Sequence, residues 1–469
     1  MRSLEVSMSQ ANGLCVHQLL EHPLKAGGPS VETAVDDLRK RVEGKEFSDI
    51  IDDEGHQYVD LVLQGGGLLG IALVGYVYVL EKAGIRFLGI AGSSAGAINA
   101  LLIAALGPPS EAKSEKLLKH LALLDASQFL DGGFFARNLS AAVSRGAGKL
   151  SILSQAAFVF PGLVKSFGLH PGRKFLSWLD DILDSEGVET CEKLEARMSV
   201  LPKGLRLRSN RDDEEARKRF KSRLPGRLAI VAVDASTKTK FVFPEMADLI
   251  WDDVGAISPS RFVRASMSIP YFFEPSRVEC DHRATKAPRW KEYGYEAELP
   301  EHHLFVDGGV VSNFPINIFH ATDVVPFAPT LGVRLGMERR APDLSSLGGF
   351  SAAWIGSARQ ALDFDFLYNN PDYQHLIGTI ETEGFNWLNF NLGPEEKLQL
   401  FARGAEAAID FLAGPKSENG ASSKKRMGFD WGRYKALREK LAEADVRSKD
   451  MQLPVPSPRS NLETVAAER

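Results

Sequence analysis

Residues 58–107 read YVDLVLQGGGLLGIALVGYVYVLEKAGIRFLGIAGSSAGAINALLIAALG, and this stretch decides the fold. It begins with a β-rich apolar run at residues 58–63, followed by a glycine cluster and a mainly apolar helical run that ends at Gly84. A second β-rich run follows at residues 86–92, and a second apolar helical run fills residues 95–107. Buried strands that alternate with buried helices predict parallel strands in a sheet of the α/β class.

The second β-rich run leads into Gly92-Ser93-Ser94-Ala95-Gly96, which fits the pattern GxSxG. Alone the pattern is weak evidence, but here it falls between a predicted strand and a predicted helix, where a nucleophile elbow lies. Small residues such as Gly92 and Gly96 permit the tight turn that lifts a serine hydroxyl clear of the backbone. The helix N-terminus also favours the negative charge that arises when a serine attacks an ester carbonyl. Ser94 is therefore predicted to be a nucleophile.

The glycine cluster Gly65-Gly66-Gly67-Leu68-Leu69-Gly70 follows the first strand and opens the first helix. Its spacing also fits a dinucleotide-binding turn, which needs a carboxylate about 20 residues further on to hold the ribose. That position falls at Ile90-Ala91-Gly92, where no carboxylate occurs. The sequence therefore argues against a dinucleotide site.

The glycine cluster and Ser94 are expected to face each other. Loops that follow successive parallel strands open on the same edge of the sheet, because the βαβ connection is right-handed. The backbone N–H groups of Gly65, Gly66 and Gly67, together with that of Ala95, would then form an oxyanion hole. Such an acyl-transfer site needs only a base in addition.

The base is a carboxylate or a histidine from later in the chain. Of the ten histidines, only His320 lies downstream near a strand-to-loop junction, and its surroundings, FPINIFHATD, are typical of a helix. Asp307 instead ends the β-rich run HHLFV and enters Gly308-Gly309, which predicts a loop at the active edge. The alternative is an ordinary Asp-Gly turn without a catalytic role.

Bulk composition excludes several classes of function. The chain has 469 residues, of which 44% are hydrophobic and 25% charged, and these values are typical of a globular protein with a large core. A formal net charge of -5 gives no basic field to draw the chain onto nucleic acid. The three cysteines are far apart, without the spacing of a metal site or a disulfide framework.

No segment predicts secretion or a membrane span. The first 30 residues lack an apolar core behind a basic start. The longest apolar stretches, at residues 68–80 and 97–106, are shorter than the roughly 20 residues that a spanning helix needs. We therefore expect a cytoplasmic protein whose contact with a membrane, if any, is peripheral.

The chain is expected to consist of three parts: an N-terminal extension at residues 1–57, a catalytic core at 58–412 and a polar, partly disordered tail at 413–469. A helical insertion is predicted at residues 108–225. Its segment 151–183 combines large apolar residues with lysine and arginine, which suits a lid or an interfacial helix. A helix that simply covers the sheet is the equally simple alternative.

In combination, these motifs resemble those of patatin-like phospholipases. GGGLLG at 65–70, GSSAG at 92–96 and DGG at 307–309 occur in the order that the family has. RASMSIPYFFEP at 264–275 and DGGVVSNFP at 307–315 resemble its flanking blocks. The resemblance covers about residues 58–412 and implies a three-layer α/β/α fold with a mainly parallel central sheet and a helical insertion.

The resemblance also implies a chemistry. Ser94 would be the nucleophile and Asp307 the base of a Ser-Asp dyad without histidine, with Gly65, Gly66 and Gly67 as oxyanion donors. The activity implied is that of a lipid acyl hydrolase, such as a phospholipase A or a lysophospholipase, with no metal or other cofactor. Its partners would be a phospholipid or another acyl lipid, and transiently a membrane surface.

Three other functions remain open from the sequence. An acyltransferase or a neutral-lipid lipase would use the same dyad and differ only in acceptor or substrate. A catalytically silent lipid-binding module is a third interpretation, against which the intact serine, aspartate and glycine cluster argue.

Leu69 departs from the family's pattern, which usually has arginine or lysine there. The departure leaves the dyad unaffected but weakens the expectation of a preference for phosphate headgroups. Arg264 is a candidate to order the neighbouring loops, and a surface or core-capping arginine is the alternative.

Overall fold

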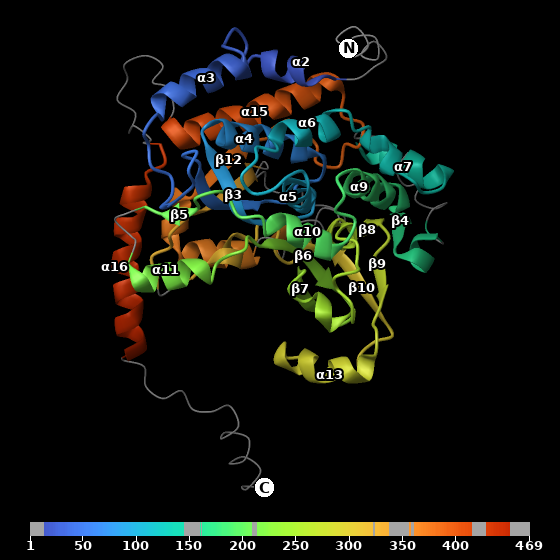
Figure 1. Cartoon of the computed structure of the whole chain (residues 1–469). Coiled ribbons are helices and arrows are strands. Elements are labelled where there is room, and N and C mark those ends of the chain that lie inside the picture. Colours follow the sequence, from blue (N-terminus) through green and yellow to red (C-terminus); the bar gives the residue numbers. More distant parts are fainter. Residues whose placement is uncertain are drawn as a thin grey trace.

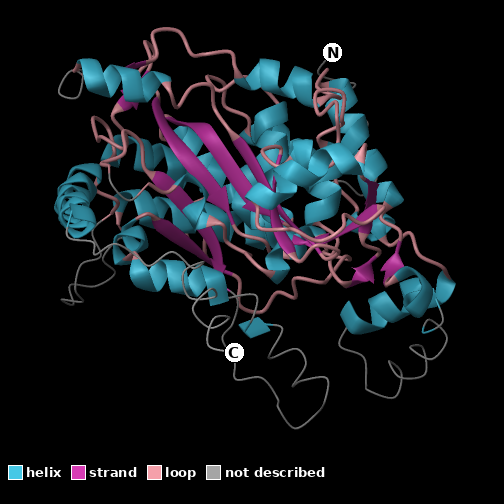
Figure 2. Ribbon diagram, turned by 90° about the horizontal axis from the view of Figure 1, so that it is seen from below, coloured by secondary structure: helices cyan, strands magenta, loops and turns pink. Residues whose placement is uncertain are grey.

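The computed structural model describes most of the chain and places a ten-stranded sheet at its centre (Figure 1). The described residues are 14–144, 160, 162–208, 213–321, 324–336, 356–357, 361–414 and 428–450. Helices cover both faces of the sheet, and Figure 2 shows its strands from below. The protein therefore has the α/β architecture that the alternating apolar runs predicted.

Five neighbouring strands of the sheet are parallel. In spatial order they are β12 (Ile377–Glu381), β11 (Thr330–Gly336), β2 (Gln57–Leu63), β3 (Ile85–Ser93) and β6 (Leu228–Asp234). β3 is buried along its whole length, which explains its continuous apolar sequence. The prediction of a mainly parallel central sheet is thus confirmed.

Antiparallel strands complete the sheet on the β6 side. β7 (Thr239–Phe243) and β10 (His302–Asp307) both pair with β6, and β9 (Ser276–Glu279) pairs with β10. At the start of β2, the short strands β1 (Ile50–Ile51) and β5 (Arg206–Leu207) form a small antiparallel extension.

The first helical layer consists of α4 (Gly70–Lys82), α5 (Ala95–Ala105) and α15 (Pro394–Ala413). α4 is apolar on nearly every side because it lies between the sheet and α15. Glycines allow the α4 and α15 backbones to touch: a Cβ atom at Gly75 would lie 2.1 Å from the Phe401 carbonyl oxygen, and one at Gly404 only 1.9 Å from that of Ala72. Outside α15 lie α2 (Val16–Glu21) and α3 (Val31–Arg41), as Figure 1 shows.

A second apolar cluster forms on the opposite face of the sheet. Tyr58 of β2 and Leu88 of β3 meet Ala216 and Phe220 of α11 (Glu214–Lys221) there. Helices therefore cover both faces, as the predicted three-layer α/β/α fold requires.

Whereas residues 145–159, 161 and 209–212 lie outside the described residues, the described parts of residues 108–225 carry mostly helices, in agreement with a helical insertion. They contain α6 (Ser114–Ala122), α7 (Phe134–Ser144), β4 (Gly168–His170), α9 (Arg173–Ser185), α10 (Cys191–Met198), β5 and α11. In the part of the chain that the structure describes, no helix is both long enough and apolar enough to cross a bilayer.

The C-terminal part predicted as a polar tail contains α16 (Trp431–Asp450), which packs against the core. Trp431 and Tyr434 are buried, and two buried ion pairs fix the helix: Lys435 Nζ lies 2.6 Å from Asp49 Oδ1, and Arg438 Nη1 lies 3.4 Å from Asp372 Oδ2. The disorder predicted from Met451 onward falls on residues that lie outside the described ones, as do residues 415–427 of the predicted polar stretch.

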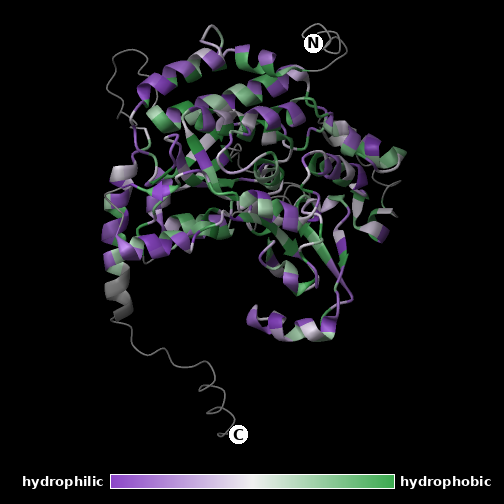
Figure 3. Ribbon diagram, in the orientation of Figure 1, coloured by the Kyte–Doolittle hydropathy of each residue, from purple (hydrophilic) through white to green (hydrophobic). Residues whose placement is uncertain are grey.

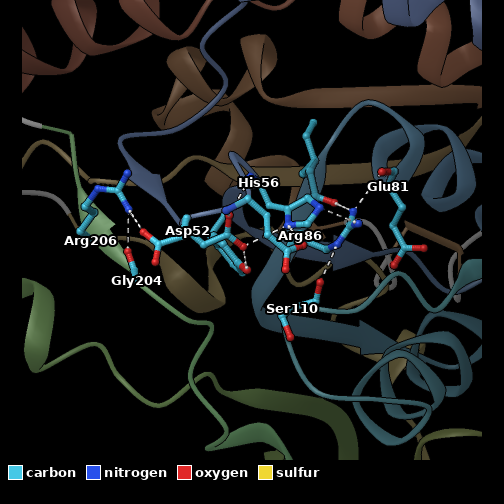
Figure 4. A network of polar contacts seen from close by, with 11 residues as sticks. Asp52, His56, Glu81, Arg86, Ser110, Gly204 and Arg206 are labelled. Carbon is cyan, nitrogen blue, oxygen red and sulfur yellow. Dashed lines mark hydrogen bonds and ion pairs between the residues drawn. The ribbon is translucent and has the colours of Figure 1, made fainter.

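A polar network holds the amino-terminal ends of β2 and β3 together (Figure 4). The buried Asp52 carboxylate accepts hydrogen bonds from the N–H groups of Glu54 and His56, at 2.9 and 2.8 Å, and from the Tyr58 hydroxyl at 2.7 Å. Its Oδ2 atom also lies 3.0 Å from His56 Nδ1. Burial alone would raise the pKa of Asp52, but the hydrogen bonds from Tyr58 and His56 hold that pKa below its usual range.

Arg86, at the start of β3, extends the network to two further segments. Its guanidinium lies 3.1 Å from His56 Nε2 and donates to the carbonyl oxygens of Glu81 at 2.9 Å and Ser110 at 3.0 Å. Asp52, His56 and Arg86 thus join the β1–β2 turn to the end of α4 and to the loop before α6 (Figure 4).

The substitution Asp52→Ala is expected to lower the free energy of unfolding by about 2–4 kcal/mol, because it leaves buried donors without an acceptor. Because the pKa of Asp52 is lowered in the folded protein, its contribution is present above the carboxyl group's ordinary pKa and is lost as the pH falls through the lowered value. Urea unfolding of both proteins at neutral and acidic pH measures this difference.

The neighbouring substitution Asp53→Ala is the matched control. Asp53 pairs with Arg206 at 2.9 Å, but both side chains are about half exposed. A loss below about 1 kcal/mol is therefore expected. Equal losses for the two substitutions would contradict the role given to the network.

Candidate active site

Ser94 occupies the turn between β3 and α5 in a strained backbone conformation. Its φ and ψ angles are 53° and -124°, a region that L-residues rarely adopt. It stands at the N-terminus of α5 and is only 2% exposed. The sharp strand-to-helix turn that GxSxG predicted is therefore present.

The two motif glycines are needed because backbones touch on both sides of this turn. A Cβ atom at Gly92 would lie 2.3 Å from the Gly96 carbonyl carbon, and one at Gly96 would lie 2.1 Å from the carbonyl oxygen of Leu63. Any larger residue would separate α5 from the ends of β2 and β3. The spacing of the motif thus follows from close packing around Ser94.

The glycine cluster lies beside Ser94, as the shared sheet edge predicted. A Cβ atom at Gly65 would lie 3.0 Å from Ser94 Cβ and 2.5 Å from Asn313 Oδ1. Asn313 holds the cluster through two hydrogen bonds. The Gly65 N–H donates to the main-chain carbonyl oxygen of Asn313 at 2.9 Å, and Asn313 Nδ2 donates to the Gly65 carbonyl oxygen at 3.1 Å.

The backbone N–H groups near Ser94 differ in whether they are free to donate a hydrogen bond to a bound oxyanion. The Gly65 N–H is already bonded to Asn313, which corrects the expectation that it is an oxyanion donor. Within the described residues, the N–H groups of Gly66, Gly67 and Ala95 have no protein acceptor. Gly67 has a positive φ of 55° and lies against the carbonyl oxygen of Trp387, which would be 2.2 Å from a Cβ atom at this position.

Asp307 reaches the same place from the opposite direction. β3 runs parallel to β6 and β10 runs antiparallel to it, with Ser93 opposite Val231 and Asp307 opposite Ala232. β7 pairs along residues 230–234 of β6, so β3 and β10 must share its other edge. The carboxyl ends of the two strands therefore meet head to head on adjacent residues of β6.

Contacts at this junction agree with the strand register. A Cβ atom at Gly308 would lie 2.7 Å from Ser93 Oγ and 2.1 Å from the carbonyl oxygen of Val231. Asp307 is 4% exposed, and its Oδ1 accepts a hydrogen bond from the Gly309 N–H at 2.6 Å. The structure thus brings the DGG and GSSAG motifs together.

A tripeptide whose role the sequence did not indicate, Ser266-Met267-Ser268, bridges the two motifs. Ser266 Oγ accepts from the Ser94 N–H at 2.9 Å and donates to the Val231 carbonyl at 2.6 Å. The Ser94 hydroxyl lies 3.5 Å from the sulfur of Met267, and the carbonyl of Ser268 accepts from the Asp307 N–H at 2.9 Å. The tripeptide belongs to the conspicuous block RASMSIPYFFEP, but spacing alone could not place it.

Arg264 is a buried arginine that ties this tripeptide to the helical insertion. It lies on α12 (Ser260–Ser266), and its guanidinium donates to Ser268 Oγ at 2.5 Å, to the Pro171 carbonyl at 2.7 Å and to the Glu274 carbonyl at 2.9 Å. Burial lowers the pKa of Arg264 to about 10, so the group stays charged at neutral pH. Of the two roles considered, ordering of neighbouring loops fits these contacts.

The other predicted positions have plain structural surroundings. Leu69 is buried in the core, so the position where the family usually has a cation carries an apolar side chain. Within the described residues, the Ser94 hydroxyl has no histidine partner, and no cluster of three or more histidine, cysteine or acidic side chains could hold a metal ion. His320 is bonded to the Tyr373 hydroxyl at 2.7 Å.

A cavity of about 280 Å³, lined by both polar and apolar side chains, adjoins the segment that follows Asp307. Ser312, Phe314, Lys240 and Asp363 are among its lining residues. The Asp363 carboxylate accepts from Ser312 Oγ at 3.1 Å and from the Phe314 N–H at 2.8 Å. Burial nevertheless raises the pKa of Asp363 to about 6.

Comparisons with known proteins place these motifs in a wider context. A family model described as patatin-like phospholipase matches residues 61–320, which include both Ser94 and Asp307. The uncharacterized protein YqhO of Bacillus subtilis (strain 168) is 26% identical over 358 residues, 76% of this chain and 98% of that protein.

Two solved structures are also similar, at low sequence identity. VipD from Legionella pneumophila is 16% identical with a TM-score of 0.35, over 78% of this chain and 70% of that chain. The type III effector ExoU, from Pseudomonas aeruginosa, is 16% identical with a TM-score of 0.33, over 75% of this chain and 52% of that chain. This chain thus matches only about half of the length of ExoU.

The strained backbone at Ser94 predicts that two substitutions at this position differ in stability. Ser94→Gly should raise the free energy of unfolding by about 1 kcal/mol relative to Ser94→Ala, because glycine adopts the observed φ without a steric penalty. Thermal unfolding of the two proteins, followed by circular dichroism, measures the difference. A lower stability of the glycine protein would show that the turn is not strained in solution.

Arg264→Ala is expected to lower the free energy of unfolding by about 3 kcal/mol, because the buried Ser268 hydroxyl and two partly buried carbonyl groups lose their donor. If Arg264 also positions the tripeptide, kcat should fall while KM for a short soluble ester stays nearly constant, and Arg264→Lys should restore part of kcat. Arg261→Ala, on the exposed side of the same helix, is the control and should change neither quantity. A stability loss with unchanged kcat would limit Arg264 to a structural role.

Proposed function

The chain belongs to the patatin-like phospholipase family, and from this premise we propose that it cleaves fatty acyl esters of lipids through a Ser94–Asp307 dyad and an acyl-enzyme. The activity would be of the phospholipase A or lysophospholipase type. The observation that carries the proposal is the convergence of β3 and β10 on adjacent residues of β6. Because of this strand register, Ser94 and Asp307 follow strands that end at the same point of the sheet, although they are more than 200 residues apart in sequence.

In the first step, Asp307 accepts the proton of the Ser94 hydroxyl while Oγ attacks the ester carbonyl carbon. The carbonyl π electrons move to the oxygen, which becomes an oxyanion. The N–H groups of Gly66, Gly67 and Ala95 are the available donors for this oxygen, and a single donor of this kind contributes roughly 3–4 kcal/mol to the transition state. The dipole of α5, which begins at Ala95, adds to the stabilisation.

In the second step, the tetrahedral intermediate collapses and the bond between the carbonyl carbon and the alcohol oxygen breaks. The leaving alcohol takes the proton from Asp307, and an acyl group remains on Ser94. Asp307 then accepts a proton from water as the water oxygen attacks the acyl carbon. Release of the fatty acid returns the proton to Ser94 and restores the enzyme.

The support for a specific headgroup is weaker than the support for ester cleavage. Leu69 is buried and apolar, so the glycine cluster offers no cation to a phosphate at this position. We therefore propose that the acyl ester itself is the main recognition element. Phosphatidylcholine, lysophosphatidylcholine and diacylglycerol should be hydrolysed at rates that differ by less than about tenfold, whereas a strict requirement for phosphate would contradict this part of the proposal.

The dyad is tested with Ser94→Ala and Asp307→Asn. Each substitution should lower kcat for a p-nitrophenyl acyl ester by at least about 1000-fold, because each removes a group on which the same step depends. Circular dichroism confirms that each protein is folded. Full activity of either variant would end the dyad assignment.

Labelling with a fluorophosphonate identifies the nucleophile directly. The label should attach to the wild-type protein but not to Ser94→Ala, because Ser94 is the proposed nucleophile. Ser93→Ala, which removes the neighbouring serine, is the matched control and should still be labelled. Absence of labelling in the wild type, together with absence of turnover, would favour a silent lipid-binding module. Formation of a new ester when a lysolipid acceptor is added would instead identify an acyltransferase.

A further inference from the structure

Large apolar side chains gather on the surface around a two-stranded ribbon of β4 and β8 (Tyr271–Phe273). We call these side chains the aromatic surface: Phe134, Phe135, Phe160, Val164, Phe167 and Tyr271. Phe134 and Tyr271 are each 65% exposed, and Phe160 is 63% exposed. Exposure of this many aromatic rings in one region is unusual for a surface that faces only water.

The aromatic surface is built from adjoining segments. α7 carries Phe134 and Phe135 and packs on β4 through Leu139 and Leu169. Phe167 precedes Gly168 of β4, which pairs with Tyr271 of β8. Figure 1 shows α7, β4 and β8 near one another on the side of the molecule that carries α9, and Figure 3 shows apolar residues on α7.

Backbone strain singles out two members of this surface. Phe167 and Tyr271 have positive φ angles of 59° and 66°. A non-glycine residue rarely adopts this conformation, and glycine or asparagine would adopt it more readily. Both rings nevertheless project into solvent, so packing inside the protein does not explain why the positions carry aromatic residues.

The charges around the aromatic surface are mainly positive. Arg137, Lys165, Arg173 and Lys174 are exposed, and within the described residues none of them forms an ion pair. Two carboxylates lie nearby: that of Asp131 is half-buried and accepts hydrogen bonds from the N–H groups of Gly172 and Lys174. The other, that of Glu274, directly follows β8 and is partly buried beside Arg264. This local excess of cations contrasts with the net charge of -5 of the whole chain.

The aromatic surface is also connected to the candidate active site. β8 follows the tripeptide Ser266-Met267-Ser268 after only two residues. Arg264 binds the carbonyl groups of Pro171 and Glu274, which directly follow β4 and β8. The ribbon is thereby held next to the segment that contacts Ser94 and Asp307.

We propose that the aromatic surface docks on an anionic lipid bilayer. The rings would enter the boundary between headgroups and acyl chains, which aromatic side chains favour, while the four cations bind lipid phosphates and carboxylates. The inference rests on the proposed function only in that the substrate lies in the bilayer. Binding itself does not depend on catalysis, so the two can fail separately.

The experiment measures co-sedimentation of the full-length Ser94→Ala protein with phosphatidylcholine vesicles, with and without phosphatidylserine. Binding should require phosphatidylserine and should weaken strongly at roughly 1 M salt, where exposed charges are screened within about 3 Å. The double variant Phe167→Gly/Tyr271→Gly should bind at least roughly tenfold more weakly, because two apolar side chains leave the interface. Arg173→Gln/Lys174→Gln should have a similar effect on the anionic vesicles only.

The glycine variant also separates docking from a structural role. Glycine relieves the unfavourable φ angles of both positions, so the thermal unfolding temperature should not fall while vesicle binding falls. In the active protein, hydrolysis of a soluble p-nitrophenyl ester should stay unchanged, whereas hydrolysis of vesicle lipid should fall with binding. Leu201→Ser, which removes an exposed apolar residue after α10, is the control and should bind like the parent protein.

Three results would overturn the proposal. The first is a parent protein that does not bind anionic vesicles, and the second is a glycine variant that binds as tightly as its parent. The third is a lipid-free dimer in light scattering that the glycine variant abolishes, which would assign the surface to a second copy of the chain. If the wild-type protein binds vesicles but hydrolyses no ester, the proposed function is refuted while the proposed docking surface is still supported.

Discussion

The edge of β6 is the constraint on which the site depends. One strand edge accepts β3 along residues 228–231 and β10 along residues 232–234, so that two chains running in opposite directions end at the same point. Neither strand can continue, because the other occupies the next position on the edge. Each must leave the sheet there, β3 through Ser94 into α5 and β10 through Asp307 into a tight turn. Backbone hydrogen bonding thus fixes the placement of both side chains.

Several buried polar contacts maintain this junction. Ser266 holds the Ser94 amide, Ser268 holds the Asp307 amide, and Arg264 holds Ser268. A backbone conformation as unfavourable as that of Ser94 persists only where its surroundings determine it on all sides. The close backbone contacts at Gly92 and Gly96 restrict this conformation, and so does the hydrogen bond between the Ser94 N–H and Ser266 Oγ. Strain at Ser94 and order in the helical insertion are therefore connected through one arginine, Arg264.

Local patterns predicted the βαβα unit, the turn at Ser94 and the adjacency of the glycine cluster, because each depends on neighbours in sequence. The meeting of β3 and β10 could not be predicted from spacing, since strand register is a long-range property. The same limit applies to Ser266 and Met267, whose contacts arise only after β6 and α12 are in place. The engagement of the Gly65 amide with Asn313 and the docking of α16 were missed for the same reason.

The attachment of α16 has a consequence for the order in which the protein can mature. Asp49 and Asp372 are buried carboxylates whose cationic partners, Lys435 and Arg438, are among the last residues of the described chain to be synthesised. Burial of an acid without its partner is costly, so the segment around β1 settles against the sheet less favourably before α16 has docked. Completion of this part of the core therefore waits for α16, and a chain whose C-terminal helix is displaced keeps two core carboxylates that still need water.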